Sequence, residues 1–408
     1  MFSCRRPLSR LVESQSFRRP GYRVFLALFV LFLLVSMHGV TWTPFYTYRG
    51  LDFQNLHAYF HGYADPLGRP MVYPPPMIWM MSWCRGIPYY AANLYWEFAI
   101  VMLTFLGTWI VSTFDRRRSA FSWMVWALLL FQLPMVYAVE RGNNDAWVIP
   151  VFTLASALVL HRKIFTAGLF FAAACWLKVY PVVPCVLLLA IFVLDPELRR
   201  RYFWKLLAGL GVGGVGIGLI FWPESWTYVT ETLPAYAKEH RLLIVSSHSL
   251  FRRWPSLFLK VPILLLWGTM FHRMFRKDPL FVFTAGLAIS TFFQDSSNDY
   301  SLITAYPFLF VLMNRMLKPG IDWRRFGWLV FSFWVFIGDR TPVAWLFHSR
   351  GAIFVHVIWF LTFPFFMKRE LDEVMWSPYS FSYPADSVRV SAPAGGPSAG
   401  GLDRQAVV

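Results

Sequence analysis

Short clusters of basic residues recur between long apolar runs, and this alternation constrains the whole chain. Clusters such as Asp115–Arg118, His161–Lys163 and Arg199–Arg201 come after every second apolar run. Cytoplasmic loops of membrane proteins carry such an excess of Lys and Arg, whereas the loops on the other side do not. The alternation predicts an all-α, polytopic integral membrane protein of about 12 transmembrane helices, with both termini in the cytoplasm.

The composition agrees with a chain whose main solvent is lipid. Of 408 residues, 57% are hydrophobic and only 15% are charged, which is too little polar surface to cover soluble domains. Aromatic residues make up 19%, as expected where many helix ends are anchored at the lipid headgroups. The net charge of +16 would suit nucleic acid, but no helix or strand carries a basic stripe, so we expect no nucleic-acid partner.

The chain divides into three parts. A basic cytoplasmic segment, 1–21, precedes an apolar run without a cleavage site, which we expect to remain as a membrane anchor. A transmembrane domain over 22–369 follows, and the Pro- and Gly-containing tail 370–408 is predicted to be cytoplasmic and largely disordered. The register assigns three notable loops to the extracytoplasmic side: 41–76, 222–254 and 294–300. The runs 165–178 and 182–194 are short, so we expect tilted or broken spans there.

The first large loop holds the leading candidate for a general base. Asp52 follows the first membrane exit closely enough to be held near the interface, and a carboxylate there can take the proton from an attacking sugar hydroxyl. An ordinary solvated or helix-capping aspartate is the structural alternative. The same loop offers Arg49, Asn55, Tyr59 and Tyr73 as substrate contacts. The prolines 74–76 that follow are predicted to form a rigid, extended strut.

A second polar cluster lies between two apolar runs, from Glu140 to Asp145. The guanidinium of Arg141 is well shaped to hold a lipid-linked phosphate. Asn143, Asn144 and Asp145 offer groups that bind sugar hydroxyls. The structural alternative is a helix cap formed by Asn144 or Asp145, with Arg141 paired to Glu140.

Further candidates lie in later turns and loops. Lys178 precedes Val179-Tyr180-Pro181 and is either a charge partner for an anionic ligand or a lysine that reaches toward the headgroups. Asp299 is a second catalytic candidate. The remaining candidates for substrate contacts are Tyr180, His248, Arg252, Asn298 and Tyr300. The late-loop residues also suit an ordinary turn, and His248 and Arg252 also suit surface charges. The positive-inside register places all these features on one side of the membrane, although they are separated by up to about 250 residues.

The sequence lacks the motifs of several common kinds of metal, nucleotide and catalytic site. The His and Cys residues, including the 4 cysteines, show no zinc-ligand spacing, and neither a Walker lysine loop nor a Gly-x-Ser-x-Gly elbow is present. We therefore expect no metal and no cofactor, and nucleotide sugars or ATP are not supported as direct donors.

Together, these motifs resemble a known group of enzymes. The segments that carry the resemblance are Asp52–Tyr59, Tyr73–Pro75, Arg141–Asp145, Lys178–Pro181 and Ser297–Tyr300. In order and spacing they are similar to the GT-C superfamily of membrane glycosyltransferases and, within it, to glycosyltransferase family 87, which includes polyprenyl-phosphate-mannose-dependent mannosyltransferases.

The resemblance implies a GT-C-like fold in the inner (plasma) membrane with an active site facing the periplasm or cell exterior. It implies a sugar donor carried on polyprenyl phosphate, a glycan or glycolipid acceptor, and an inverting displacement with Asp52 as base. Arg141 and Lys178 then become candidates for the phosphate, with Arg49 or Arg252 in support. Some mannosyltransferases of the family use a late-loop histidine where this chain has Asn298 and Asp299, so the resemblance does not name the sugar.

Other functions of a chain of this type stay open at this point. A secondary transporter would carry coupling charges near the middle of broken helices, yet the apolar runs here are nearly free of charge. A polysaccharide polymerase, ligase or flippase component would use the same lipid carriers, and the long segment 222–254 suits it. A non-catalytic relative that scaffolds other enzymes is a further alternative.

Overall fold

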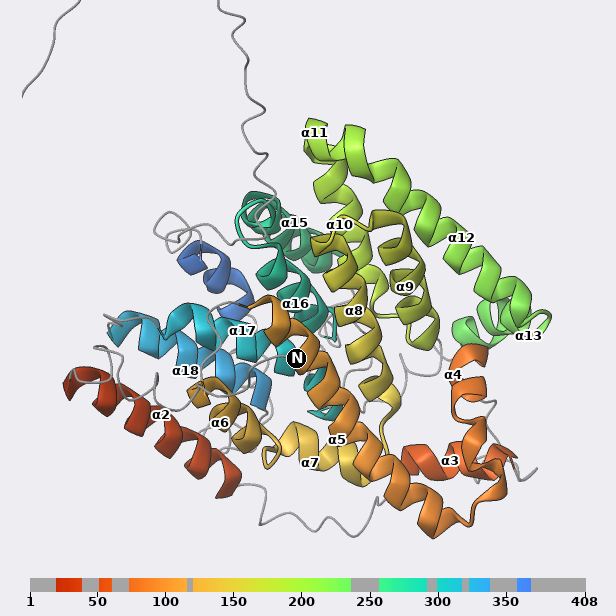
Figure 1. Ribbon diagram of the computed structural model, residues 1–408, viewed down its shortest axis with the longest axis horizontal. Coiled ribbons are helices and arrows are strands. Elements are labelled where there is room, and N and C mark those ends of the chain that lie inside the picture. Colours follow the sequence, from red (N-terminus) through yellow and green to blue (C-terminus); the bar gives the residue numbers. More distant parts are fainter. Residues whose placement is uncertain are drawn as a thin grey trace, which may run out of the picture.

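The computed structural model describes residues 20–38, 51–60, 73–115, 120–235, 257–291, 299–317, 323–337 and 358–367. Within these ranges the regular elements are all helices, and no strand occurs (Figure 1). The all-α prediction is confirmed for this part of the chain. Helices satisfy their own backbone hydrogen bonds, as a segment surrounded by lipid must.

Two described helices are long and apolar enough to cross a bilayer. One is α5 (Tyr89–Phe114), whose 26 residues make it roughly 39 Å long. The other is the continuous run of α11 (Pro196–Leu198), η4 (Arg199–Phe203) and α12 (Trp204–Ile220). These helices support an association with membranes.

A third candidate for a crossing consists of two helices joined at a bend. α6 (Ala120–Leu129) and α7 (Leu133–Arg141) meet at 49°, which is the geometry of a broken span or of a re-entrant loop. The break has a local cause, because Pro134 in the first turn of α7 has no N–H with which to continue α6. The bend also turns Gln132 toward α2, where its Nε2 donates to the carbonyl oxygen of Leu33 at 3.0 Å.

The other main helices of the described part of the chain are shorter. They are α2 (Pro20–His38), α8 (Val148–Leu160), α9 (Ile164–Leu177), α10 (Val182–Leu194), α15 (Leu257–Phe275), α16 (Pro279–Ser290), α17 (Tyr306–Met316), α18 (Trp323–Ile337) and the helix Ile358–Met367. The number of spans and the cytoplasmic position of both termini stay predictions.

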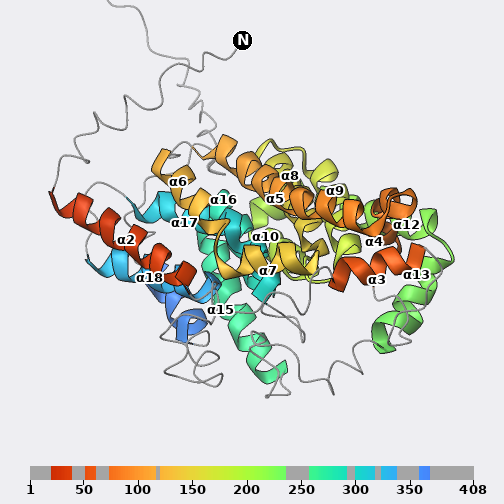
Figure 2. The same ribbon diagram turned by 90° about the horizontal axis from the view of Figure 1, so that it is seen from below.

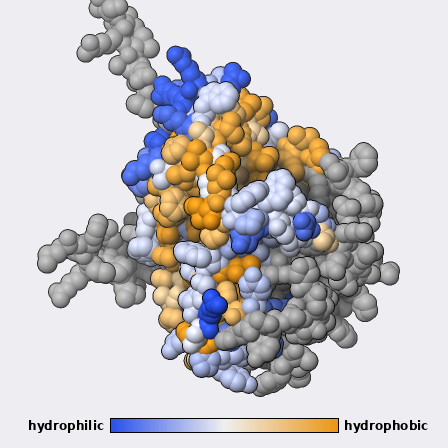
Figure 3. Space-filling view, turned by 90° about the vertical axis from the view of Figure 1, so that its right-hand side faces the viewer, coloured by the Kyte–Doolittle hydropathy of each residue, from blue (hydrophilic) through white to orange (hydrophobic). Residues whose placement is uncertain are grey.

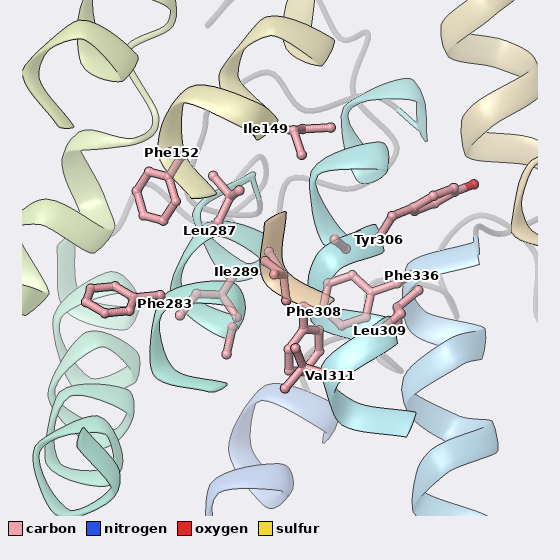
Figure 4. Close-up of a cluster of buried hydrophobic side chains, with 14 of the residues drawn as sticks. Ile149, Phe152, Phe283, Leu287, Ile289, Tyr306, Phe308, Leu309, Val311 and Phe336 are labelled. Atoms are coloured by element: carbon pink, nitrogen blue, oxygen red, sulfur yellow. The ribbon is translucent and has the colours of Figure 1, made fainter. Parts of the chain in front are cut away.

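Close packing of small residues joins the helices of the central layer. α9 lies against both α8 and α12 (Figure 1). A Cβ atom at Gly209 of α12 would lie 2.2 Å from the backbone oxygen of Phe165, so the two helices touch there only because this residue is glycine. Elsewhere the core is filled by large apolar side chains from α8, α16, α17 and α18, among them Phe152, Phe283, Leu287, Phe308 and Phe336 (Figure 4).

The surface over α12 is apolar. Figure 3 shows a hydrophobic band across this side of the molecule, with hydrophilic residues gathered above it. Val212, Val215 and Leu219 of α12 are exposed by 57%, 63% and 66%. A helix that turns aliphatic side chains outward fits contact with lipid chains.

Short helices cover one end of the bundle, which we call the α3 end. They are α3 (Leu51–Phe60), α4 (Pro75–Met80), η2 (Ser82–Gly86), α13 (Glu224–Thr227) and η5 (Tyr228–Thr232). Figure 2, seen from below, shows α3 and α7 lying across this end. The expected extended strut at 74–76 is wrong, because only Pro74 is extended and the next two prolines open α4, where a missing N–H is tolerated.

Buried charges tie the helices together at the opposite end. Arg315 of α17 pairs with Asp278 through Nε at 2.5 Å and with Asp115 through Nη1 at 2.8 Å. Asn314 Nδ2 donates to Asp115 Oδ2 at 2.9 Å, and Ser122 donates to Asn314. These buried polar contacts therefore join the ends of α5, α6, α16 and α17.

Candidate functional site

The turn after α7 is built around a glycine that no other residue can replace without strain. Gly142 has a left-handed backbone (φ 68°, ψ 45°), and its N–H donates to Val139 while that of Asn143 donates to Ala138. This pair of bonds closes the helix in the usual glycine-dependent way. A Cβ atom at Gly142 would lie 2.5 Å from the Cβ of Phe53, so α3 packs directly on the turn.

The close approach places the start of α3 beside the Arg141–Asp145 turn. Phe53 is the residue after Asp52, and its backbone nitrogen lies 3.3 Å from the same Cβ position. Trp96 of α5 holds the turn from the other side, because its Nε1 donates to the carbonyl oxygen of Gly142 at 2.9 Å. The structure thus brings the backbone of Asp52 to the second polar cluster, while the Asp52 side chain lies outside the described residues.

Asn143 fixes the carboxylate of Asp145. Its Oδ1 accepts the backbone N–H of Asp145 at 2.9 Å, and its Nδ2 donates to Asp145 Oδ2 at 3.1 Å. The residue that caps η3 (Asn144–Trp147) is therefore Asn143, rather than Asn144 or Asp145 as the capping alternative had it. Both Asn143 and Asp145 are buried, so this orientation is held away from water.

A buried ion pair joins this turn to the turn between α9 and α10. Lys178 Nζ lies 3.2 Å from Asp145 Oδ1, and the two side chains are 25% and 2% exposed. Lys178 ends α9 in an extended conformation, and its ammonium lies 5.2 Å from the centre of the Tyr73 ring. The lysine is thus held between a carboxylate and an aromatic face.

Two polar side chains in this region are buried with no hydrogen-bond partner among the described residues. Neither Oδ1 nor Nδ2 of the fully buried Asn144 is bonded, and the same holds for the hydroxyl of Tyr180. Each buried polar group without a hydrogen-bond partner lowers the folding stability by about 1–3 kcal/mol. Two such groups in one region therefore call for an explanation, such as a bound ligand. Burial and, second, the charge of Asp145 raise the pKa of Tyr180, which keeps its hydroxyl a proton donor.

The late loop also reaches this place. η7 (Asp299–Ala305), which begins with Asp299 and Tyr300, packs against α7 and η3. The side chains of these two residues are outside the description, and four further candidates lie wholly outside the described residues: Arg49, His248, Arg252 and Asn298.

Comparison with known proteins decides the family. The model of glycosyltransferase family 87 matches residues 71–296, which is more than half of the chain. The chain belongs to glycosyltransferase family 87. No curated protein and no solved structure matches it. Membership makes the chain a glycosyltransferase, and the matched region includes Tyr73, the Arg141–Asp145 turn and Lys178.

Two other described candidates of this glycosyltransferase lie on α3. Asn55 is half-buried and Tyr59 is 49% exposed. Helical spacing places both on the same side of α3 as position 52. The Arg141 guanidinium lies 6.0 Å from the Tyr137 ring, one turn earlier on α7. In the described part of the chain, no three His, Cys, Asp or Glu side chains gather in a way that would hold a metal ion.

Sequence reasoning missed the residues that build the turn. Gly142 follows the last residue of an apolar helix, a position where a left-handed glycine is common, so its role had a sequence signal. Trp96 and Phe53 had none, because each contact depends on how α3 and α5 pack against α7.

We predict that Lys178→Met lowers the unfolding free energy by about 3–5 kcal/mol, because it leaves Asp145 buried without its partner. Equilibrium unfolding of the purified protein in mixed detergent micelles measures this. The double variant Lys178→Met/Asp145→Asn removes the orphaned charge and should recover part of the loss. A single variant as stable as the native chain, or a double variant with no recovery, would show that the pair does not hold the two turns together.

Proposed function

We propose that this chain is a multi-pass glycosyltransferase of the inner (plasma) membrane that moves a sugar from polyprenyl phosphate to an extracytoplasmic glycan or glycolipid. The observation that carries the proposal is the pair of buried, unbonded groups on Asn144 and Tyr180 beside the Asp145–Lys178 ion pair. A sugar phosphate has hydroxyls that can bond to these two groups, and its negative charge can pair with Lys178.

The phosphate of the donor would be held by cations at the α3 end. Lys178 keeps a quarter of its side chain exposed while Asp145 and Tyr73 fix its position, so its ammonium is pre-oriented for a second anion. Arg141, in the last turn of α7, adds a guanidinium whose fork matches phosphate oxygens. Arg49 and Arg252 are proposed in support.

The transferred sugar would meet the unbonded groups. The amide of Asn144 offers both a donor and an acceptor, and protonated Tyr180 offers a donor. Asn144 and Tyr180 belong to the two turns that the Asp145–Lys178 ion pair joins, which supports a shared role for them. Asn143 acts as a positioning residue, because its amide already orients the Asp145 carboxylate.

The chemical step would be a single displacement with inversion. Asp52 takes the proton from the acceptor hydroxyl as that oxygen bonds to the anomeric carbon, and the bond from this carbon to the phosphate oxygen breaks. Polyprenyl phosphate leaves with the electron pair. The start of α3 next to Gly142 supports Asp52 in this role. Asp299 is the second catalytic candidate, and further substrate contacts are assigned to Asn55, Tyr59, His248, Asn298 and Tyr300.

We predict that Asp52→Asn lowers sugar transfer by ~10²–10⁴-fold, since an amide cannot accept the proton. Purified protein is given radiolabelled polyprenyl-phosphate sugars and a membrane extract as the source of acceptor. Asp65→Asn, a matched change in the same segment 41–76, should keep the native rate. Undiminished transfer by Asp52→Asn would remove Asp52 as the base.

We predict that Asn144→Leu weakens sugar transfer without destabilising the fold. Because the amide has no partner among the described residues, replacing it with an apolar side chain of similar size should leave the unfolding free energy unchanged or raise it by up to about 3 kcal/mol. Transfer should fall by about 10–100-fold, the cost of one or two lost hydrogen bonds to the sugar. A variant that loses stability but transfers sugar normally would make Asn144 a structural residue.

A further inference from the structure

An open groove of about 650 Å³ lies between α3 and the junction of η2 with α5. It is lined by Gln54, His57, Ala58, Arg85, Gly86, Ile87, Pro88 and Tyr89. The α3 residues in this lining are spaced so that they occupy the side of the helix opposite to positions 52, 55 and 59. The groove is therefore separate from the proposed sugar site, with α3 as the wall between them.

The groove has the charge expected of an anion site. The side chain of Arg85 is exposed, and among the described residues that line the groove there is no Asp or Glu to neutralise it. His57 is anchored in the wall, because its Nε2 donates to the carbonyl oxygen of Ile87 at 3.0 Å and its ring lies 5.5 Å from that of Tyr89. Much of the remaining lining is hydrocarbon, which fits a ligand that is anionic at one end and apolar at the other.

The neighbouring surface indicates the depth at which the groove lies. Trp79 of α4 is 66% exposed, Trp83 of η2 is 37% exposed, and Tyr90 at the start of α5 is 87% exposed. Exposed tryptophan and tyrosine rings gather at the level of the lipid headgroups. These three residues flank the groove in the sequence, and the helices that carry them, α4, η2 and the start of α5, belong to the α3 end of the bundle (Figure 1).

We infer that this groove binds the phosphate headgroup of a membrane lipid, with Arg85 as the residue that holds the phosphate. A guanidinium binds phosphate oxygens in a fork, while Ile87, Pro88 and Tyr89 provide an apolar wall for the first carbons of the lipid. The lipid is either an anionic phospholipid of the bilayer or a polyprenyl phosphate, since both present the same group at the same depth. The inference does not depend on sugar transfer.

The test places the full chain in phosphatidylcholine nanodiscs with a small amount of phosphatidylglycerol that carries a photoreactive diazirine in its headgroup. After illumination, mass spectrometry maps the labelled peptides. We expect labels in peptides that contain residues 54–58 or 85–89, and we expect Arg85→Gln to lower them at least fivefold. Arg200→Gln, which removes an exposed arginine from η4 at the opposite end, should leave them unchanged.

A competitor identifies the source of the phosphate. If unlabelled polyprenyl phosphate displaces the label at low molar ratio, the groove belongs to the lipid carrier; if only unlabelled phosphatidylglycerol does so, it belongs to the bilayer phospholipids. Either result supports the site. Equal labelling of native chain and Arg85→Gln, or labels confined to other peptides, would overturn it whatever the outcome of the sugar-transfer assays.

Discussion

The buried ion pair between Asp145 and Lys178 is the contact on which the site depends. It joins the turn after α7 to the turn between α9 and α10. Asn143 orients the carboxylate, while the Tyr73 ring lies against the ammonium. Because charges removed from water attract each other strongly, loss of one partner would free both turns.

The same pair joins the two turns that carry the unbonded groups of the candidate site. It holds Asn144 and Tyr180 in positions where their polar groups are buried without partners among the described residues. A folded protein tolerates such groups where a ligand or ordered water completes them. In the function proposed above, that ligand is a sugar with its phosphate. Membership of a glycosyltransferase family favours transfer over the transporter alternative.

The sequence predicted helices well where apolar runs end at charged or proline-containing turns. The predicted run 182–194 has the bounds of α10, because Pro181 and Asp195 mark its ends. It also predicted that the Arg141–Asp145 cluster and Lys178 would share one end of the bundle. It did not predict which asparagine caps η3, or that Arg315 would pair with residues far away in the sequence, because such contacts are set by helix packing and leave no local pattern.

The most direct test of this account is a cryo-electron microscopy structure of the chain in lipid nanodiscs with a polyprenyl-phosphate sugar bound. The account predicts that the phosphate lies within about 4 Å of Lys178 Nζ, and that the amide of Asn144 bonds to a sugar hydroxyl. A carrier bound away from Lys178, with Asn144 and Tyr180 still without a partner, would contradict the central claim that these groups form the sugar-phosphate site.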